Sequence, residues 1–292
     1  MASLKEIKNR IGSVKSTLKI TSAIKMVASV KLHHAQMAIG NLLPYEKKLT
    51  GILGHLMESA MEPGPYEEDR KVKSVAVLAC ASNSSLCGAY NSNVIKQVKA
   101  VLDEYGGKGI PVTVYSVGKK MSEAMRKIGA VSPEDLTGLA AKPDYAGAAA
   151  LAERLMKAFL SGKYDRVELV YTHYRSTSSH VVRRETYLPF SVEEEKTMAG
   201  DASADSAALD DFILEPGRED LFEKLLPMVM CLKIYTVLLD ASESEYAART
   251  MAMQTATDNG NDLLQELTLE YNKGRQQKIT NEILDIVGGS AS

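Results

Sequence analysis

The sequence contains no tryptophan, four phenylalanines and three cysteines in 292 residues. Large aromatic side chains supply much of the buried area of globular cores, so their scarcity argues against one large globular core. The three thiols, Cys80, Cys87 and Cys231, show no CxxC spacing and no even-numbered disulfide framework, which favours a reducing compartment. No run approaches about 18 consecutive apolar residues, and charged residues interrupt the N-terminal segment. We therefore expect neither a membrane-spanning helix nor a signal peptide.

The net charge of −2 hides a segregation of charge between the two ends of the chain. Residues 1–50 hold nine lysines and arginines against two acidic residues, which gives a net charge of +7. Residues 218–292 hold seven basic residues against twelve acidic ones, which gives a net charge of −5. Opposite charges at opposite ends predict that the two ends lie side by side.

The N-terminal segment has the repeat of a coiled coil. Alternate steps of three and four residues visit sixteen positions, of which thirteen are apolar. These seam positions are Leu4, Ile7, Ile11, Val14, Leu18, Thr21, Lys25, Ala28, Leu32, Ala35, Ile39, Leu42, Glu46, Leu49, Leu53 and Leu56. The seam turns polar at Thr21 and Lys25. We expect Pro44 to kink the helix and residues 58–70 to end it.

The C-terminal segment repeats this pattern, with eleven apolar residues among fourteen seam positions. They are Leu221, Leu225, Met228, Leu232, Tyr235, Leu239, Ser242, Tyr246, Arg249, Met253, Ala256, Gly260, Leu263 and Leu267. An apolar face continues from Ile279 to Val287, and only Pro227, Gly260 and Gly274 argue against one continuous helix. The two seams are predicted to pair antiparallel, with the longer C-terminal helix protruding.

The middle of the chain alternates predicted strands and helices. Residues 72–80, 110–117 and 166–173 have the composition of buried strands, and an alanine-rich helix is expected at 144–160. Residues 180–189 are expected to add an edge strand. The predicted fold class is α/β: a long antiparallel coiled coil of the terminal helices with a small, mainly parallel, Rossmann-like domain inserted between them.

The corresponding domain organisation has five parts. We expect an N-terminal helix over 1–57, a linker over 58–71, the α/β domain over 72–190, and a C-terminal helix over 218–292. The remaining segment, 191–217, is acidic and rich in alanine and serine, and is expected to be mobile.

No complete catalytic, cofactor or metal site is predicted. Residues 84–91 follow the first strand, where α/β proteins bind phosphate, but they lack the P-loop and GxGxxG patterns. Gly88 is expected to form a tight turn, and Cys87 to be an inert thiol because no base is paired with it in the sequence. His33 and His34 are adjacent on a helix and point apart, so they do not suggest metal ligation.

Two features leave alternatives open. Met26, Met251 and Met253 can fill the seam or offer adaptable contacts to a partner. The basic face of residues 5–31 can be solvated or can bind an acidic protein.

Three segments carry a resemblance to a known family. The first is KEIKNRIGSVKSTLKITSAIKMVASVK (5–31), the second SSLCGAYN (84–91), and the third is EYAARTMAMQTATDNGNDLLQELTLEYNKGRQQKITNEILDIVGG (245–289). Together they resemble signatures of the gamma subunit of rotary F-type ATP synthases of the bacterial type. Ile24 and Thr250 stand where the family often has Met, and Gly274 and Gln277 where Ala is common. No cysteine pair lies in 190–217, so the redox switch of chloroplast members is not expected.

The resemblance implies a non-catalytic rotor subunit that couples proton-driven rotation to conformational change in the catalytic beta subunits. Its implied partners are the alpha and beta subunits, the epsilon subunit and the ring of c subunits, without a cofactor or nucleic acid. The implied location is the cytoplasmic face of the cell membrane, as a peripheral subunit. The residues implied to contact beta subunits are Ile24, Lys25, Met26, Arg249, Arg275, Gln276 and Thr280.

Two other classes of function fit parts of the sequence. A nucleic-acid-binding or scaffolding coiled coil would explain the basic N-terminal helix, but the acidic C-terminal helix opposes nucleic-acid binding. A Rossmann-like enzyme would explain the middle of the chain, but the phosphate fingerprint is missing.

Overall fold

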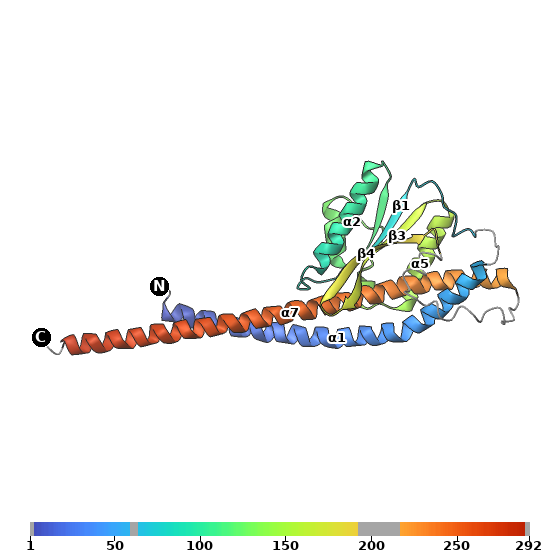
Figure 1. The fold of residues 1–292 in the computed structure, drawn as a ribbon. Coiled ribbons are helices and arrows are strands. Elements are labelled where there is room, and N and C mark those ends of the chain that lie inside the picture. Colours follow the sequence, from blue (N-terminus) through green and yellow to red (C-terminus); the bar gives the residue numbers. More distant parts are fainter. Residues whose placement is uncertain (1–2, 59–63, 192–216, 290–292) are drawn as a thin grey trace. The chain divides into compact units, whose positions relative to one another are not determined.

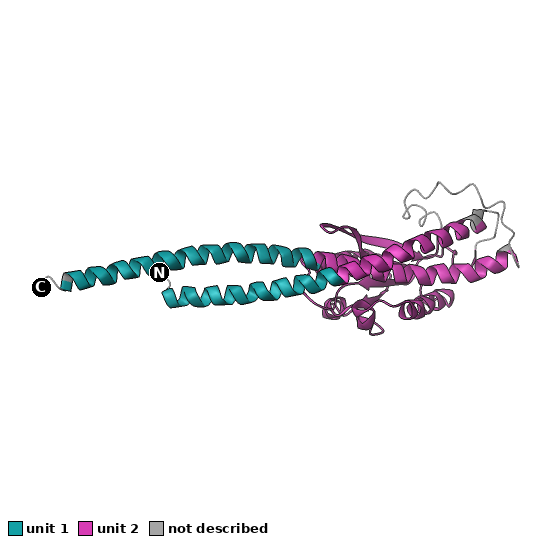
Figure 2. Cartoon of the chain, turned by 90° about the horizontal axis from the view of Figure 1, so that it is seen from below, with its two compact units in different colours: residues 1–30, 249–292 teal, residues 31–248 magenta. Residues whose placement is uncertain are grey.

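The computed structural model describes residues 3–58, 64–191 and 217–289 (Figure 1). The chain divides into two compact units (Figure 2). Unit 1 combines residues 1–30 with residues 249–292, and unit 2 comprises residues 31–248. Most of the acidic segment predicted at 191–217 lies outside the described residues.

Two long helices run through both units. Helix α1 spans Leu4–Glu58 and helix α7 spans Arg218–Gly289, with 55 and 72 residues. Pro44 lies inside α1 and Pro227 inside α7, and neither proline ends its helix. A proline removes one backbone hydrogen bond, and extensive side-chain packing can outweigh that loss.

The paired helices of unit 1 bury the predicted seam of α1. All eight seam positions from Leu4 to Ala28 are buried or half-buried, whereas most residues between them are exposed. Within unit 1 the predicted seam of α7 is wrong at one position, because Leu263 is exposed and Leu264 is half-buried instead. In unit 2 the predicted seam residue Met228 is also exposed. An α-helix has 3.6 residues per turn, so strict alternation of three and four drifts, and a second step of four after Gly260 corrects the drift.

Unit 2 is built on a four-stranded sheet with the order β2-β1-β3-β4. The strands are β1 (Val75–Cys80), β2 (Val112–Val117), β3 (Arg166–Ser176) and β4 (Ser179–Leu188). β1 is parallel to both β2 and β3, and β4 is antiparallel to β3. The mainly parallel sheet with an added edge strand is thus confirmed. β1 is buried along its whole length, as a central parallel strand requires.

Helices cover both faces of this sheet (Figure 1). The connecting helices are α2 (Tyr90–Gly107), α3 (Lys119–Lys127), α4 (Thr137–Ala141) and α5 (Tyr145–Leu160). One core joins the sheet to α2 and α3. The other core joins the opposite face to α5 and to apolar residues of the long helices, among them Leu53 and Ile234. Within unit 2 the α/β domain is therefore built onto α1 and α7.

Among the described residues one helix, α7, is apolar enough by composition to cross a membrane, with a mean hydropathy of 1.6 in its best window. More than half of that window, 56%, is buried inside the protein. A core helix of a soluble protein has the same composition, and the core on the α5 side of the sheet contains many of the apolar residues of α7.

Candidate functional site

A small cavity lies at the carboxyl ends of β1 and β2, where α/β proteins bind phosphate. Its volume is about 10 Å³, and Cys80, Tyr90, Val117, Ser242 and Glu245 are among its lining residues. That volume is the space of about one water molecule and is far too small for a nucleotide. Among the described residues, no group of three or more histidine, cysteine or acidic side chains is placed to hold a metal ion.

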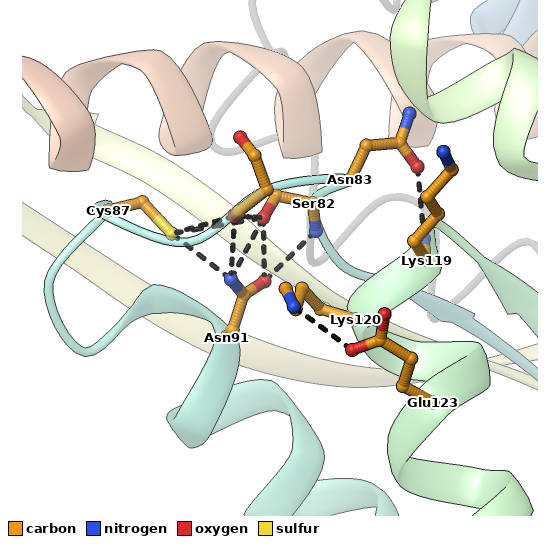
Figure 3. A network of polar contacts seen from close by, with 8 residues as sticks. Ser82, Asn83, Cys87, Asn91, Lys119, Lys120 and Glu123 are labelled. Carbon is orange, nitrogen blue, oxygen red and sulfur yellow. Dashed lines mark hydrogen bonds and ion pairs between the residues drawn. The ribbon is translucent and has the colours of Figure 1, made fainter.

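The segment 84–91 forms a tight loop that is tied down by polar contacts (Figure 3). Gly88 has a φ of 57°, the left-handed conformation that glycine adopts freely, as the predicted turn requires. Asn91 Oδ1 accepts a hydrogen bond from the backbone N–H of Ser82 (3.0 Å), and Asn91 Nδ2 donates to Cys87 Sγ (3.1 Å). Cys87 is buried, and its polar side-chain neighbours are the Asn91 amide and the Ser82 hydroxyl, neither of which acts as a base. The loop therefore has a structural role.

Unit 1 carries the exposed apolar side chains that a partner surface needs. On α1 these are Ile20, Met26, Val27 and Val30. On α7 they include Leu269, Ile279, Ile283, Leu284, Ile286 and Val287. α1 begins at Leu4, which packs against Gly274, so the last 15 residues of α7 have no neighbouring helix among the described residues of unit 1. Large exposed apolar side chains that gather on one part of a molecule are typical of interaction surfaces.

The predicted contact residues lie in two bands along the pair. Residues 24–26 of α1 and Arg249 of α7 belong to the first band, and Arg275, Gln276 and Thr280 form the second. Arg249 and Arg275 are 26 residues apart on one helix, which corresponds to about 39 Å. This separation follows from the residue numbers, because both arginines belong to one continuous helix.

The members of these bands differ in exposure. Met26 is 71% exposed, Ile24 and Lys25 are half-buried, and Arg249 is only 8% exposed. Arg275, Gln276 and Thr280 are exposed, and the Thr280 hydroxyl donates to the backbone carbonyl of Gln276 (2.9 Å). The side chains of the second band are therefore exposed to solvent, whereas Lys25 is half-buried and Arg249 is buried.

The polar break at Thr21 and Lys25 meets polar residues of α7. Thr21 Oγ1 and Thr257 Oγ1 are 3.0 Å apart. Lys25 Nζ donates to Gln254 Oε1, and Gln254 Nε2 donates to both carboxylate oxygens of Asp258 (2.8 and 2.9 Å). Lys25 thus contacts a neutral amide, and that amide is in turn hydrogen-bonded to the Asp258 carboxylate. The sequence pattern did not single out Gln254, Thr257 and Asp258. The sign of them in the sequence is that they are polar residues close to the seam position Met253.

The basic face of α1 is exposed in unit 1. Lys5, Lys8, Arg10, Lys15 and Lys19 point to solvent, and in the described part of the chain none of them has an acidic partner within ion-pair distance. Glu6 is the one acidic residue within 3–30. This concentration of free positive charge suits an acidic protein surface.

In unit 2 a polar cluster joins β3 to the long helices. His173 Nδ1 lies 2.6 Å from Asp240 Oδ2, and the backbone N–H of Tyr174 donates to Asp240 Oδ1 (2.8 Å). Glu243 is buried beside this pair. Burial raises the pKa of Glu243, the nearby Asp240 raises it further, and a hydrogen bond from Gln36 and the neighbouring His173 oppose the rise.

Comparison with known proteins identifies relatives over the whole chain. A family model described as ATP synthase matches residues 3–292. The ATP synthase gamma chain of Phocaeicola vulgatus is 52% identical over 292 residues, which cover 99% of each chain. The ATP synthase gamma chain of Flavobacterium johnsoniae is 41% identical and covers 99% of this chain and 98% of its own.

Solved structures with the same fold are more distant in sequence. One is a chain of the mitochondrial ATP synthase of Euglena gracilis (OSCP/F1/c-ring), with a TM-score of 0.66 and 23% identity, covering 99% of this chain and 93% of that chain. Another is a chain of the mitochondrial ATP synthase central stalk and c-ring of Tetrahymena thermophila, with a TM-score of 0.55 and 22% identity. It covers 81% of this chain and 99% of that chain. At these identities the likeness concerns the fold alone.

Proposed function

This chain belongs to the family of ATP synthase gamma chains, and we propose that it turns as the central-stalk rotor that couples proton-driven ring rotation to the catalytic beta subunits. The observation that carries the proposal is the construction of unit 1. Its seam is buried, one helix carries free positive charge, and the other continues alone with exposed apolar residues. Such a pair has a different face in every direction.

That asymmetry supplies a mechanism. A single shaft cannot present the same face to three identical beta subunits at one time. Contacts that differ in free energy hold the three subunits in different conformations, and rotation exchanges those conformations. Because coupling between linked equilibria is reciprocal, ATP hydrolysis on the beta subunits turns the shaft if the turning shaft drives synthesis.

The contact residues divide by their exposure. Met26, Arg275, Gln276 and Thr280 are proposed to touch beta subunits directly in some rotary states, and Ile24 borders that contact. Lys25 and Arg249 are proposed to support the first band from within the helix pair. The basic face of α1 would meet acidic segments of the beta subunits, although individual surface ion pairs contribute only about 0–1 kcal/mol.

The remaining partners are proposed from the family. The α/β domain of unit 2 would bind the epsilon subunit and the ring of c subunits, so the chain would act as a peripheral subunit at the cytoplasmic face of the cell membrane. The chain itself contributes no catalytic group to ATP turnover.

Reconstitution tests this function. The purified chain should neither hydrolyse ATP nor bind it tightly, and it should copurify as one copy with three alpha and three beta subunits. Hydrolysis should appear only when alpha and beta subunits are present. ATP turnover by the isolated chain that is lost on mutating a residue within it would contradict the proposal, as would salt-dependent DNA binding without assembly.

A further inference from the structure

We infer that Thr21, Lys25, Gln254, Thr257 and Asp258, the polar layer of unit 1, lock α1 to α7 in one alignment so that the helix pair turns as one body. This inference rests on the proposed rotor function and assigns positioning residues to it. It concerns contacts between the two helices and not contacts with a partner subunit.

The two helices keep one alignment along unit 1. The residue numbers of facing residues add up to 278 or 279 throughout unit 1. The facing pairs are Leu4 with Gly274, Leu18 with Gly260, Thr21 with Thr257, and Lys25 with Gln254. A constant total is what an antiparallel pair without slippage gives, and the polar layer lies within this aligned stretch.

The apolar seam alone holds α1 weakly. Leu4, Ile11, Val14 and Leu18 are only half-buried, and Ala28 is small. An apolar seam also repeats every seven residues, so a shifted pairing still places apolar against apolar. Non-directional packing of this kind resists rolling and sliding less than directional hydrogen bonds do.

The contact between Lys25 and Gln254 is directional. The amide of Gln254 is oriented by Asp258, which accepts both hydrogen bonds from Nε2, so its oxygen is held toward the Lys25 ammonium. In a pairing shifted by seven residues Lys25 would face Ala247 or Asn261, and in a pairing shifted by one turn it would face Met251. A charged group between helices is tolerated only when it is hydrogen-bonded, so a shift that breaks this contact is disfavoured.

A close approach of Leu18 to Gly260 marks the same alignment beside the polar layer. A Cβ atom on Gly260 would lie 2.7 Å from Leu18 Cδ2, so the Leu18 side chain occupies the space that glycine leaves. Leu18 is one turn from Thr21, and Gly260 is one turn from Thr257. The polar contacts and this close approach therefore fix the same alignment at the same height of the pair.

Disulfide trapping in the full-length chain tests the lock. One reporter carries Leu4→Cys with Gly274→Cys, the native pair, and the other carries Leu4→Cys with Tyr271→Cys, one turn away. Each is combined with the native layer, with Lys25→Met plus Gln254→Leu, or with Lys25→Gln plus Gln254→Lys. The exchanged layer keeps a lysine–glutamine bond and places its lysine on α7, four residues from Asp258. The native thiols Cys80, Cys87 and Cys231 are buried and serve as internal controls.

With the native layer, oxidation should trap the 4–274 pair faster than the 4–271 pair. The apolar layer should raise the relative rate of the 4–271 pair about tenfold, the scale of one charge-assisted hydrogen bond, and the exchanged layer should restore it. The outer-face variant Lys19→Met plus Gln265→Leu is the matched control and should change neither rate. Equal relative rates in the native and apolar layers would overturn the lock, and this readout does not depend on any partner subunit.

A second measurement tests the purpose of the lock. In the reconstituted complex the apolar layer should lower ATP-driven proton pumping more than ATP hydrolysis, and the exchanged layer should recover pumping. Altered trapping with unchanged pumping would show that the alignment does not serve the rotor. A chain that traps as expected but fails to assemble with alpha and beta subunits would contradict the proposed function and leave the alignment result standing.

Discussion

Glu243 on α7 is a buried carboxyl that lies near a second carboxyl, Asp240, and is contacted by Gln36 of α1 and His173 of β3. Its pKa is raised in the folded chain, so the folded state keeps a proton that the unfolded state releases. The stability of the chain therefore falls as the pH rises from the unfolded pKa of Glu243 through the folded one.

Glu243→Gln should remove this pH dependence. The variant should melt at a higher temperature than the parent at neutral pH, and the difference should shrink below about pH 4, where glutamate is protonated in both states. Thermal melting of both chains across this pH range measures the effect. The exposed Glu153→Gln serves as control, and a variant less stable than the parent at neutral pH would show that the ionised carboxylate is needed.

Ile24 is half-buried beside the polar layer, next to the exposed Met26. We expect Ile24→Lys to leave folding and assembly largely intact and to add an ionic contact with an acidic segment of a beta subunit. Proton pumping should then fall more than ATP hydrolysis. Ser22→Lys, on a different exposed side of α1, should change neither. The variant chain could instead lose a few kcal/mol of folding free energy, on the order of a defect in a protein core, while the coupling of hydrolysis to pumping stays unaltered. That result would place Ile24 inside the seam.

At the scale of residues, the sequence singled out Lys25 but not the residue that it contacts. Lys25 stood out because it is a charge at a seam position, which requires compensation. Its contact, Gln254, is 229 residues away along the chain. Arg249, Gln254 and Asp258 are all polar residues near the seam of α7, and only the alignment of the two helices selects among them.

At the scale of elements, the glycines of the paired helices have opposite roles. Gly260→Leu should destabilise the chain by about 1–3 kcal/mol, because Leu18 already fills the space in front of Gly260. Gly12→Ala is the matched variant on α1: no atom lies within 4 Å of its Cβ position, so it should stabilise the helix by about 0.5–1 kcal/mol. Denaturant unfolding of both variants measures these changes in the free energy of unfolding. Equal changes for the two substitutions would contradict the close packing at Gly260.

Elements were predictable where their burial pattern is simple. The seam of α1 follows from alternate steps of three and four because only α7 covers this helix in unit 1. The same rule chose Leu263 in place of Leu264, because one ambiguous step at Gly260 moves the pattern to the next residue. Along α7 in unit 2 the seam is also less distinct, because the α/β domain buries Val229 and Met230 outside the predicted positions.

At the scale of the whole molecule, the exposed second band is predicted to matter only in the assembled complex. Arg275→Ala with Gln276→Ala should lower steady-state ATP turnover severalfold without preventing assembly or changing the stability of the free chain. The alternative role, pairing of Arg275 within α7, is not observed in the described residues, where Glu282 pairs with Lys278 (3.7 Å). The neighbouring pair Asn272→Ala with Lys273→Ala is the control. Parent-like turnover in an assembled complex would exclude a contact role for the band.

The rotor assignment itself could be made from the sequence only through its likeness to a family. Periodicity and charge predicted two paired helices around a small α/β domain, and they leave open what such a pair does. Residues 84–91 and the buried cysteines do not indicate the function, because their contacts stabilise the loop and the core. The mechanical role depends on partners that local physical chemistry does not name.

The distance along the chain between the two helices has a consequence for biosynthesis. Thr21 and Thr257 touch although 236 residues separate them, so α1 leaves the ribosome long before its partner exists. At about 5–20 residues per second, the seam of α1 waits roughly 12–47 s without a cover. Over that interval the like charges of the lysines and the arginine around the seam would repel those of another nascent α1 segment. The positive charge that is proposed to bind beta subunits in the finished rotor would then first limit association between chains during their synthesis.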